Sequence, residues 1–187
     1  MANDATIGYL TVVHQERTGW TGGLLVLNRG GRPLEFQCTL PVRPSRAHVI
    51  LYGPSLRDHL IAEVIAPALV GRVRTKMSLV AVDQPESLRI EAGEDIPVVL
   101  VADAAEADEG PIDPDMLVGW PSTDFSGATI RYPAQAAERM DELVPQFTDL
   151  PDGAEPFERI REAIAEAHAQ IARRQIQPQD QITGRAA

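Results

Sequence analysis

Residues 19–46 read GWTGGLLVLNRGGRPLEFQCTLPVRPSR, and this stretch decides the first half of the fold. The apolar run at 23–28 has the length and composition of a buried strand. The NRGG that follows predicts a tight hairpin turn, because asparagine and glycine tolerate the positive φ angles that such turns require. Residues 33–40 then alternate apolar and polar side chains, as a strand with one buried face does. We therefore expect an antiparallel hairpin here.

The single cysteine, Cys38, lies in the second strand of this hairpin. It shares a face with Leu34, Phe36 and Leu40, so we expect it to point into the core as a small hydrophobic side chain. A buried thiol in apolar surroundings has a raised pKa and low reactivity, which argues against a catalytic cysteine. One cysteine also excludes an intramolecular disulfide framework and a multi-cysteine zinc site.

The segments on either side of the hairpin extend this pattern. A β-branched and aromatic run at 7–14 predicts a first strand, which completes an antiparallel three-stranded meander. The prolines of PVRPSR end the third strand, and Ser45 can cap a short helix over 46–52. A longer amphipathic helix is expected over 56–70, with Pro67 kinking or shortening its end.

The rest of the chain predicts further strands and then helices. We expect buried strands at 77–82 and 96–102 with one short helix between them, and an edge strand at 129–132. Amphipathic helices are expected at 134–143 and 156–176. The element order indicates a mixed α/β fold with C-terminal helices.

Length and charge set the expected organisation of the chain. The 187 residues suit one domain, or a domain with a helical appendage. Through Lys76 there are nine Lys and Arg against five Asp and Glu, a net charge of +4, and the remainder carries a net charge of −14. Such a split is found in molecules with two different faces, but it is also what an acidic half made of solvated loops and helix surfaces produces. The expected divisions are a mixed α/β core at 1–103, an acidic loop region at 104–128, an edge strand with helices at 129–176 and a flexible tail at 177–187.

Several functional classes find no support in the sequence. No run approaches 18 apolar residues, and the first residues lack the basic start of a signal peptide, so we expect a cytoplasmic protein without membrane contact. Neither a glycine-rich phosphate loop nor a G-x-S-x-G nucleophile elbow is present, and we expect no cofactor. The basic residues are sixteen arginines and one lysine, which indicates a GC-rich microbial genome.

Two features could hold a metal ion but lack the usual ligand sets. His59 and Glu63 are four residues apart in the expected helix and share a face. The usual zinc helix needs a second histidine and a third ligand, which the sequence does not supply, so we expect no metal site. The acid-rich loop at 103–115 lacks the EF-hand ligand pattern, and weak or no cation binding is the expectation.

The order of elements resembles that of ribonuclease-H-like domains. In those domains, acids on the first strand, the helix and the fourth strand hold divalent metals for phosphodiester cleavage. Glu63 and Asp83 match the second and third of these positions, but the first strand, IGYLTVVH, contains no acid. The resemblance therefore implies a non-catalytic relative, with a divalent-metal-dependent nuclease as the alternative.

Basic residues in turns and loops indicate a binding face. Arg29 and Arg32 lie at the opposite end of the third strand from the PVRPSR break, so the two ends cannot form one anion pocket. The expected partner-binding residues are Arg43, Arg46, Arg72, Arg74 and Lys76. A pI near 4.8 argues against nucleic acid as the favoured partner. We predict an accessory, protein-interacting subunit without its own catalytic centre, and keep a nucleic-acid-directed protein as the alternative.

Overall fold

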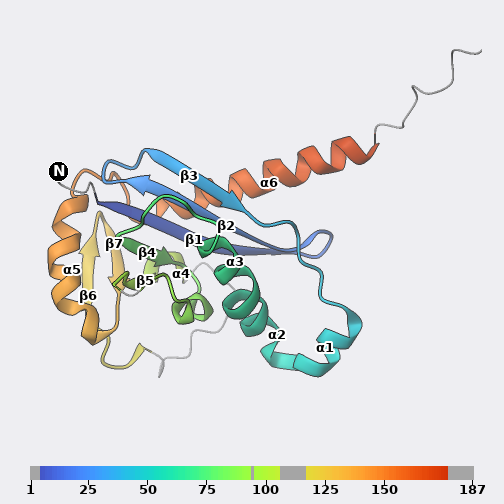
Figure 1. Ribbon diagram of the computed structural model, residues 1–187, viewed down its shortest axis with the longest axis horizontal. Coiled ribbons are helices and arrows are strands. Elements are labelled where there is room, and N and C mark those ends of the chain that lie inside the picture. The colour runs from blue at the N-terminus through green and yellow to red at the C-terminus, as the bar shows by residue number, and fades with distance from the viewer. Residues whose placement is uncertain (1–4, 94, 106–116, 177–187) are drawn as a thin grey trace, which may run out of the picture.

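The computed structural model describes residues 5–93, 95–105 and 117–176. Over these residues one seven-stranded mixed sheet has the order β3-β2-β1-β4-β5-β7-β6, with helices packed on both faces (Figure 1). The strands are β1 (Thr6–Gln15), β2 (Gly19–Asn28), β3 (Pro33–Cys38), β4 (Leu79–Val82), β5 (Val98–Val101), β6 (Ser122–Phe125) and β7 (Ala128–Arg131). The α-helices are α1 (Arg46–Tyr52), α2 (Leu56–Asp58), α3 (Ala66–Val70), α4 (Ala102–Ala105), α5 (Ala137–Leu143) and α6 (Glu155–Ile176).

Strand directions divide the sheet into three parts. β2 pairs antiparallel with both β1 and β3, and β1, β4 and β5 run parallel to one another. β7 pairs antiparallel with β5 on one side and with β6 on the other. The expected mixed α/β sheet with C-terminal helices is confirmed. The strand expected at 129–132 forms as β7, but it is not an edge strand, because β6 forms a hairpin with β7 through Ser126 and Gly127 and takes the edge itself.

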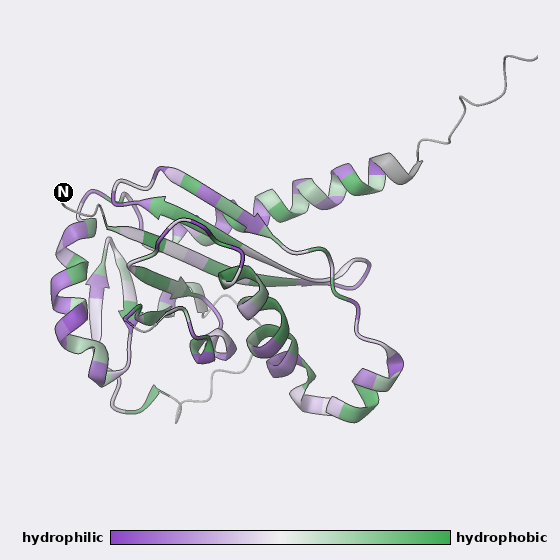
Figure 2. Cartoon of the chain, viewed as in Figure 1, coloured by the Kyte–Doolittle hydropathy of each residue, from purple (hydrophilic) through white to green (hydrophobic). Residues whose placement is uncertain are grey.

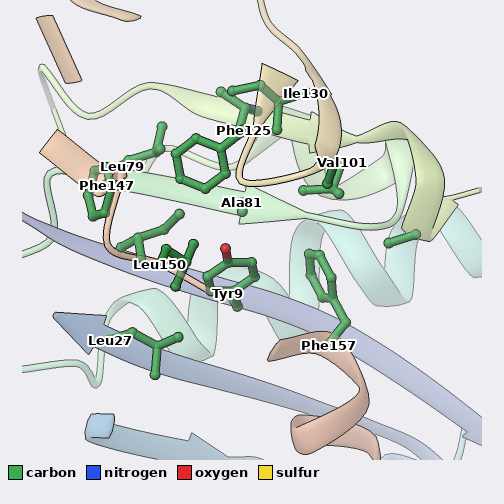
Figure 3. Packing of buried hydrophobic residues seen from close by; sticks show 14 of the residues in the cluster. Tyr9, Leu27, Leu79, Ala81, Val101, Phe125, Ile130, Phe147, Leu150 and Phe157 are labelled. Atoms are coloured by element: carbon green, nitrogen blue, oxygen red, sulfur yellow. The ribbon is translucent and has the colours of Figure 1, made fainter. Parts of the chain in front are cut away.

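Side-chain alternation along β1 assigns each face of the sheet its own core. Ile7 and Tyr9 pack on the face covered by α5 and α6, and Leu10 and Val12 pack on the face covered by α3. Figure 3 shows the first of these cores, where the Tyr9 and Phe157 rings pack edge to face with centroids 5.1 Å apart. Burial raises the pKa of the Tyr9 phenol.

A pair of glycines in β2 lets helices approach both faces of the sheet. A Cβ atom on Gly22 would lie 2.3 Å from a methyl carbon of Ile65, and one on Gly23 would lie 2.4 Å from a methyl carbon of Ile160. Any larger side chain would push one of the two helical layers away from the strand. The glycines therefore act in packing.

The expectation that β3 buries one whole face is wrong. Leu34 and Phe36 are exposed, as is Leu40 beyond the strand, and Cys38 is half-buried against the core shared with α6. β3 is an edge strand, whereas α6 packs mainly over β1 and β2, so the helix covers only part of this face. Cys38 is in the predicted phase but lies at the border of the core.

The helix expected over 56–70 is continuous but irregular. Its middle, His59–Ile65, is π-helical and ends just before α3. Pro67 stands in the first turn of α3, where a missing backbone N–H is best tolerated. The expected short helix between β4 and β5 is a 3₁₀ turn, Pro85–Arg89. Over the described residues, no helix combines the length and apolarity that a membrane crossing needs.

Candidate functional site

Asp83 lies at the carboxyl end of β4, beside the middle of β1. The parallel register pairs Leu10 with Val82, which brings Thr11 next to Asp83. The Thr11 hydroxyl donates a hydrogen bond to Asp83 Oδ2 at 2.8 Å, and Arg161 Nη2 of α6 donates to the same oxygen at 2.5 Å. The Asp83 side chain is fully buried, so the guanidinium group supplies charge compensation that water cannot.

The next residue, Gln84, holds the chain where β4 ends. Its side-chain Nε2 donates to the carbonyl oxygen of Val12 at 2.8 Å, and its Oε1 accepts from the Val12 amide at 2.9 Å. The amide group thereby satisfies backbone groups of β1 that a longer β4 would have paired. Asp83 is consequently held in place by the β-ladder before it and by Gln84 after it.

A second polar contact fastens α6 to the sheet two turns after Arg161. The His168 ring lies 3.0 Å from Thr21 Oγ1 through Nε2 and 3.1 Å from Gln15 Oε1 through Nδ1. Ile164 is fully buried between the two polar residues. Arg161 and His168 are seven residues apart, which is two helical turns, so both lie on the inner face of α6. This spacing is the sequence signal that could have placed Arg161 beside the sheet.

Glu63 lies on the other face of the sheet from Asp83. It belongs to the helical layer whose Leu60 and Ile61 pack on the α3 side, and it is mostly exposed. Its Oε2 lies 2.7 Å from Nδ1 of His59, whose ring stacks on Tyr52 at 4.1 Å. The structure therefore does not bring Glu63 and Asp83 together. Within the described ranges, no group of three or more His, Cys, Asp or Glu residues could hold a metal ion.

The acidic stretch at 103–115 is described only at its start. Asp103 accepts a hydrogen bond from the Thr129 amide at 2.5 Å, which ties the end of β5 to β7. Residues 106–116 and the tail at 177–187 lie outside the described residues.

The expected group of five basic residues is split between two ends of the sheet. Arg43 donates hydrogen bonds to backbone carbonyls of the β1–β2 turn, next to Trp20, which bridges to Val42. The loop at 72–76 lies at the other end of β2. The Glu35 carboxylate of β3 accepts hydrogen bonds from the amides of residues 74 and 75, and Glu35 stands opposite Val26 of β2 in the sheet. Trp20 and Val26 are six residues apart in an extended strand, roughly 20 Å.

The split follows from strand direction. The loop at 72–76 leads into β4, which runs parallel to β1 and must begin at the same end of the sheet. Arg43 follows β3, which runs antiparallel to β2 and finishes beside the start of β2. The structure therefore does not bring Arg43 and Arg46 together with Arg72, Arg74 and Lys76. The loop at 72–76 instead lies at the sheet end that carries the β2–β3 turn.

Residues 43–55, which we call the arm, project away from the sheet with α1 at their tip (Figure 1). No residue of α1 is buried, although the helix contains Val49, Ile50 and Leu51. Figure 2 shows this projecting helix with a hydrophobic stretch next to polar residues. The arm returns to the body at α2, where Arg57 lies 5.8 Å from the Trp20 ring and pairs with Glu86 at 2.6 Å.

A separate cleft has a volume of about 640 Å³. It lies between the loop before β5 and the start of α5, and Ile96, Pro97 and Pro133 form part of its apolar wall. Arg139 at its edge is already paired with Glu142 at 2.9 Å. The cleft has the volume of a small-molecule site, but Asp95 and Gln135 also line it, so its lining is not the mostly apolar one that is typical of such sites.

No protein-family model matches the chain, and no curated protein shows significant sequence similarity to it.

Proposed function

We propose that the protein is a non-catalytic, protein-interacting subunit built on a ribonuclease-H-like sheet. The order β3-β2-β1-β4-β5, with β2 antiparallel and β4 and β5 parallel to β1, supports this reading of the fold. It is an argument from architecture, which by itself assigns no activity. The site chemistry carries the functional part of the proposal.

The observation that carries the proposal is the Arg161 guanidinium beside Asp83. In a ribonuclease-H-like arrangement, carboxylates from neighbouring strands would gather at this point to hold divalent cations. Here Thr11 stands on β1 where a second acid would be, and Arg161 brings a positive charge to the remaining carboxylate. A divalent cation would have to displace this charge or be repelled by it. The arrangement suits a structural ion pair that fastens α6.

The arm supports an interaction role, because it presents apolar side chains that the protein itself leaves uncovered. Of the five expected partner-binding residues, we assign Arg46 to the contact surface, since it lies in α1, and Arg43 to anchoring the arm on the β1–β2 turn. The loop at 72–76 lies at the other end of the sheet and falls outside this surface.

Divalent metal and nuclease assays test the non-catalytic part of the proposal. We expect millimolar Mg²⁺ or Mn²⁺ to leave the Tm unchanged, because the site is already charge-compensated, and we expect no metal-dependent cleavage of DNA or RNA. Asp83→Asn and Glu63→Gln variants serve as controls. Mn²⁺-dependent cleavage that either substitution abolishes would overturn the proposal.

The second candidate function is a nucleic-acid-directed protein, including a divalent-metal-dependent nuclease. The position of Asp83 at the carboxyl end of β4, next to β1, is the observation that favours it. Purification of the protein from its host with and without nuclease treatment separates the two candidates. A protein partner that survives nuclease treatment supports the interaction role, and co-purifying nucleic acid supports the alternative.

A further inference from the structure

The α1 helix contains apolar side chains that are exposed to solvent. Ile50 and Leu51 are 70% and 79% exposed, and Val49 and nearby Leu40 are exposed as well. Three consecutive residues at 100° per residue spread around more than half of the helix, so no rotation of α1 against the body would hide all three. A helix that is apolar over so much of its circumference is normally surrounded by other protein.

The arm is nevertheless held in its helical shape. The Ser45 hydroxyl accepts a hydrogen bond from the His48 amide at 3.2 Å, and the Gly53 amide caps the last turn by donating to the Val49 carbonyl. Stacking of Tyr52 on His59 fixes the end of the helix to the body. Seven residues are too few for a stable isolated helix in water, so these attachments preorganise a conformation that the segment would not keep alone.

The charged side chains of the arm itself all have one sign. Residues 36–57 contain Arg43, Arg46 and Arg57 and no acidic residue, although the chain as a whole carries a net charge of −10. Arg57 is already engaged by Glu86. Arg46 stands at the exposed start of α1, one turn from Val49 and Ile50. The arm therefore offers aliphatic anchors with a positive charge beside them.

We propose that the arm is a docking helix that enters an apolar groove with an acidic rim on a different protein. This inference rests on the proposed interaction function and specifies the partner's surface. A groove can contact several sides of α1, which matches the spread of Val49, Ile50 and Leu51 around the helix. Acidic groups on the rim would meet Arg46 and raise the rate of association.

A second copy of this chain is a poorer occupant. A symmetric contact between two arms would bring Arg43 and Arg46 of both copies into one interface to which the arms contribute no acidic residue. Docking of the arm onto the exposed Leu34 and Phe36 of another copy would be a head-to-tail contact, and such contacts make rings or open polymers. Nucleic acid is also disfavoured, because exposed Ile50 and Leu51 offer no stacking surface to bases.

The first test introduces a photoreactive residue into the full chain in its own host, as Ile50→p-benzoylphenylalanine. The control is Val118→p-benzoylphenylalanine, because Val118 is 73% exposed and lies outside the arm. We expect position 50, and not position 118, to crosslink one defined protein. Crosslinking to a second copy, to nucleic acid or to lipid, or no crosslinking specific to position 50, would overturn the inference.

The second test measures the Kd of the crosslinked protein, once purified, for variants of the chain. Ile50→Asp and Leu51→Asp should each weaken binding by at least about tenfold, as expected for loss of a buried aliphatic anchor. Arg46→Glu should weaken it several-fold, with an effect that shrinks at high salt. Val118→Asp should bind like the wild type. None of these residues is buried, so the variants should keep their circular dichroism spectrum and Tm.

The outcomes separate this inference from the function on which it rests. Unchanged affinity in Ile50→Asp and Leu51→Asp would overturn the docking helix and leave an interacting subunit that uses another surface. Metal-dependent nuclease activity would overturn the non-catalytic function, whichever way the arm variants behave. The wild type is also tested for binding to vesicles of phosphatidylserine and phosphatidylcholine. If it binds them and Ile50→Asp does not, the arm binds a membrane surface and not a protein groove, and the inference is overturned.

Discussion

Removal of Arg161 tests whether the ion pair with Asp83 holds α6 on the sheet. The Asp83 side chain is fully buried, whereas 36% of the Arg161 side chain is exposed. Breaking a fully buried ion pair costs about 3–5 kcal/mol, and an exposed pair is worth about 0–1 kcal/mol. Arg161→Ala removes the Arg161 guanidinium from the buried carboxylate but lets water approach from the exposed side. We therefore expect a loss of about 2–3 kcal/mol in the free energy of unfolding.

Urea denaturation followed by circular dichroism measures this loss, with the m-value as a check on two-state unfolding. Arg139→Ala is the matched control, because its pair with Glu142 lies on the surface of α5 and both side chains are exposed. It should cost no more than about 0.5 kcal/mol. The double variant Asp83→Asn with Arg161→Met should lose less stability than Arg161→Ala alone, since it removes the buried negative charge together with the guanidinium that compensates it.

Equal losses in Arg161→Ala and Arg139→Ala would refute this reasoning. That result would mean that water solvates Asp83 in the native state. A greater loss in the double variant than in Arg161→Ala would also count against it.

Three further outcomes follow from local geometry. Gly23→Val should cost at least about 2 kcal/mol in urea denaturation, because a Cβ would already overlap Ile160, and Gly30→Val in the exposed turn is the control. Hydrogen bonds from Gln37 and from the amides of the loop after α3 lower the pKa of Glu35 to about 2 from 4.5. The stabilisation that these bonds give is therefore present above pH 4.5 and is lost as the pH falls toward 2. A carbon-13 titration of the carboxyl group that gives a pKa near 4.5 would contradict this. Burial raises the pKa of Cys38, so native labelling by a thiol reagent should be slower than labelling of the unfolded chain at neutral pH, and equal rates would show an open thiol.

Much of the local structure could be predicted from short stretches of the chain. The NRGG turn, the strands on either side of it, the Ser45 cap and α1 all occur where their residues predict them. Each depends on backbone preferences and hydrogen bonds within a few residues of the position concerned. The phase of Cys38 was predictable for the same reason, because alternation in a strand is a local property.

The missing coverage of β3 and the extra edge strand could not be predicted in this way. Leu34 and Phe36 have the pattern of a buried face, but whether that face is buried depends on where a helix more than a hundred residues later lies. The β6–β7 hairpin does carry a local signal, Ser126-Gly127, which dipeptide rules associate with turns. Only the pairing of β7 with β5 places this hairpin in the main sheet.

The candidate site was decided almost entirely by the tertiary structure. Asp83, Thr11 and Arg161 come from three distant parts of the chain, and the parallel register of β1 and β4 together with the docking of α6 brings them into contact. The same strand directions separate Arg43 from the loop at 72–76, although both are basic and both follow secondary structure elements. Sequence alone determined which residues could form strands, turns and caps, because those preferences act over a few bonds. Which charges meet was decided by strand order and direction, because electrostatic and packing energies depend on distance in space.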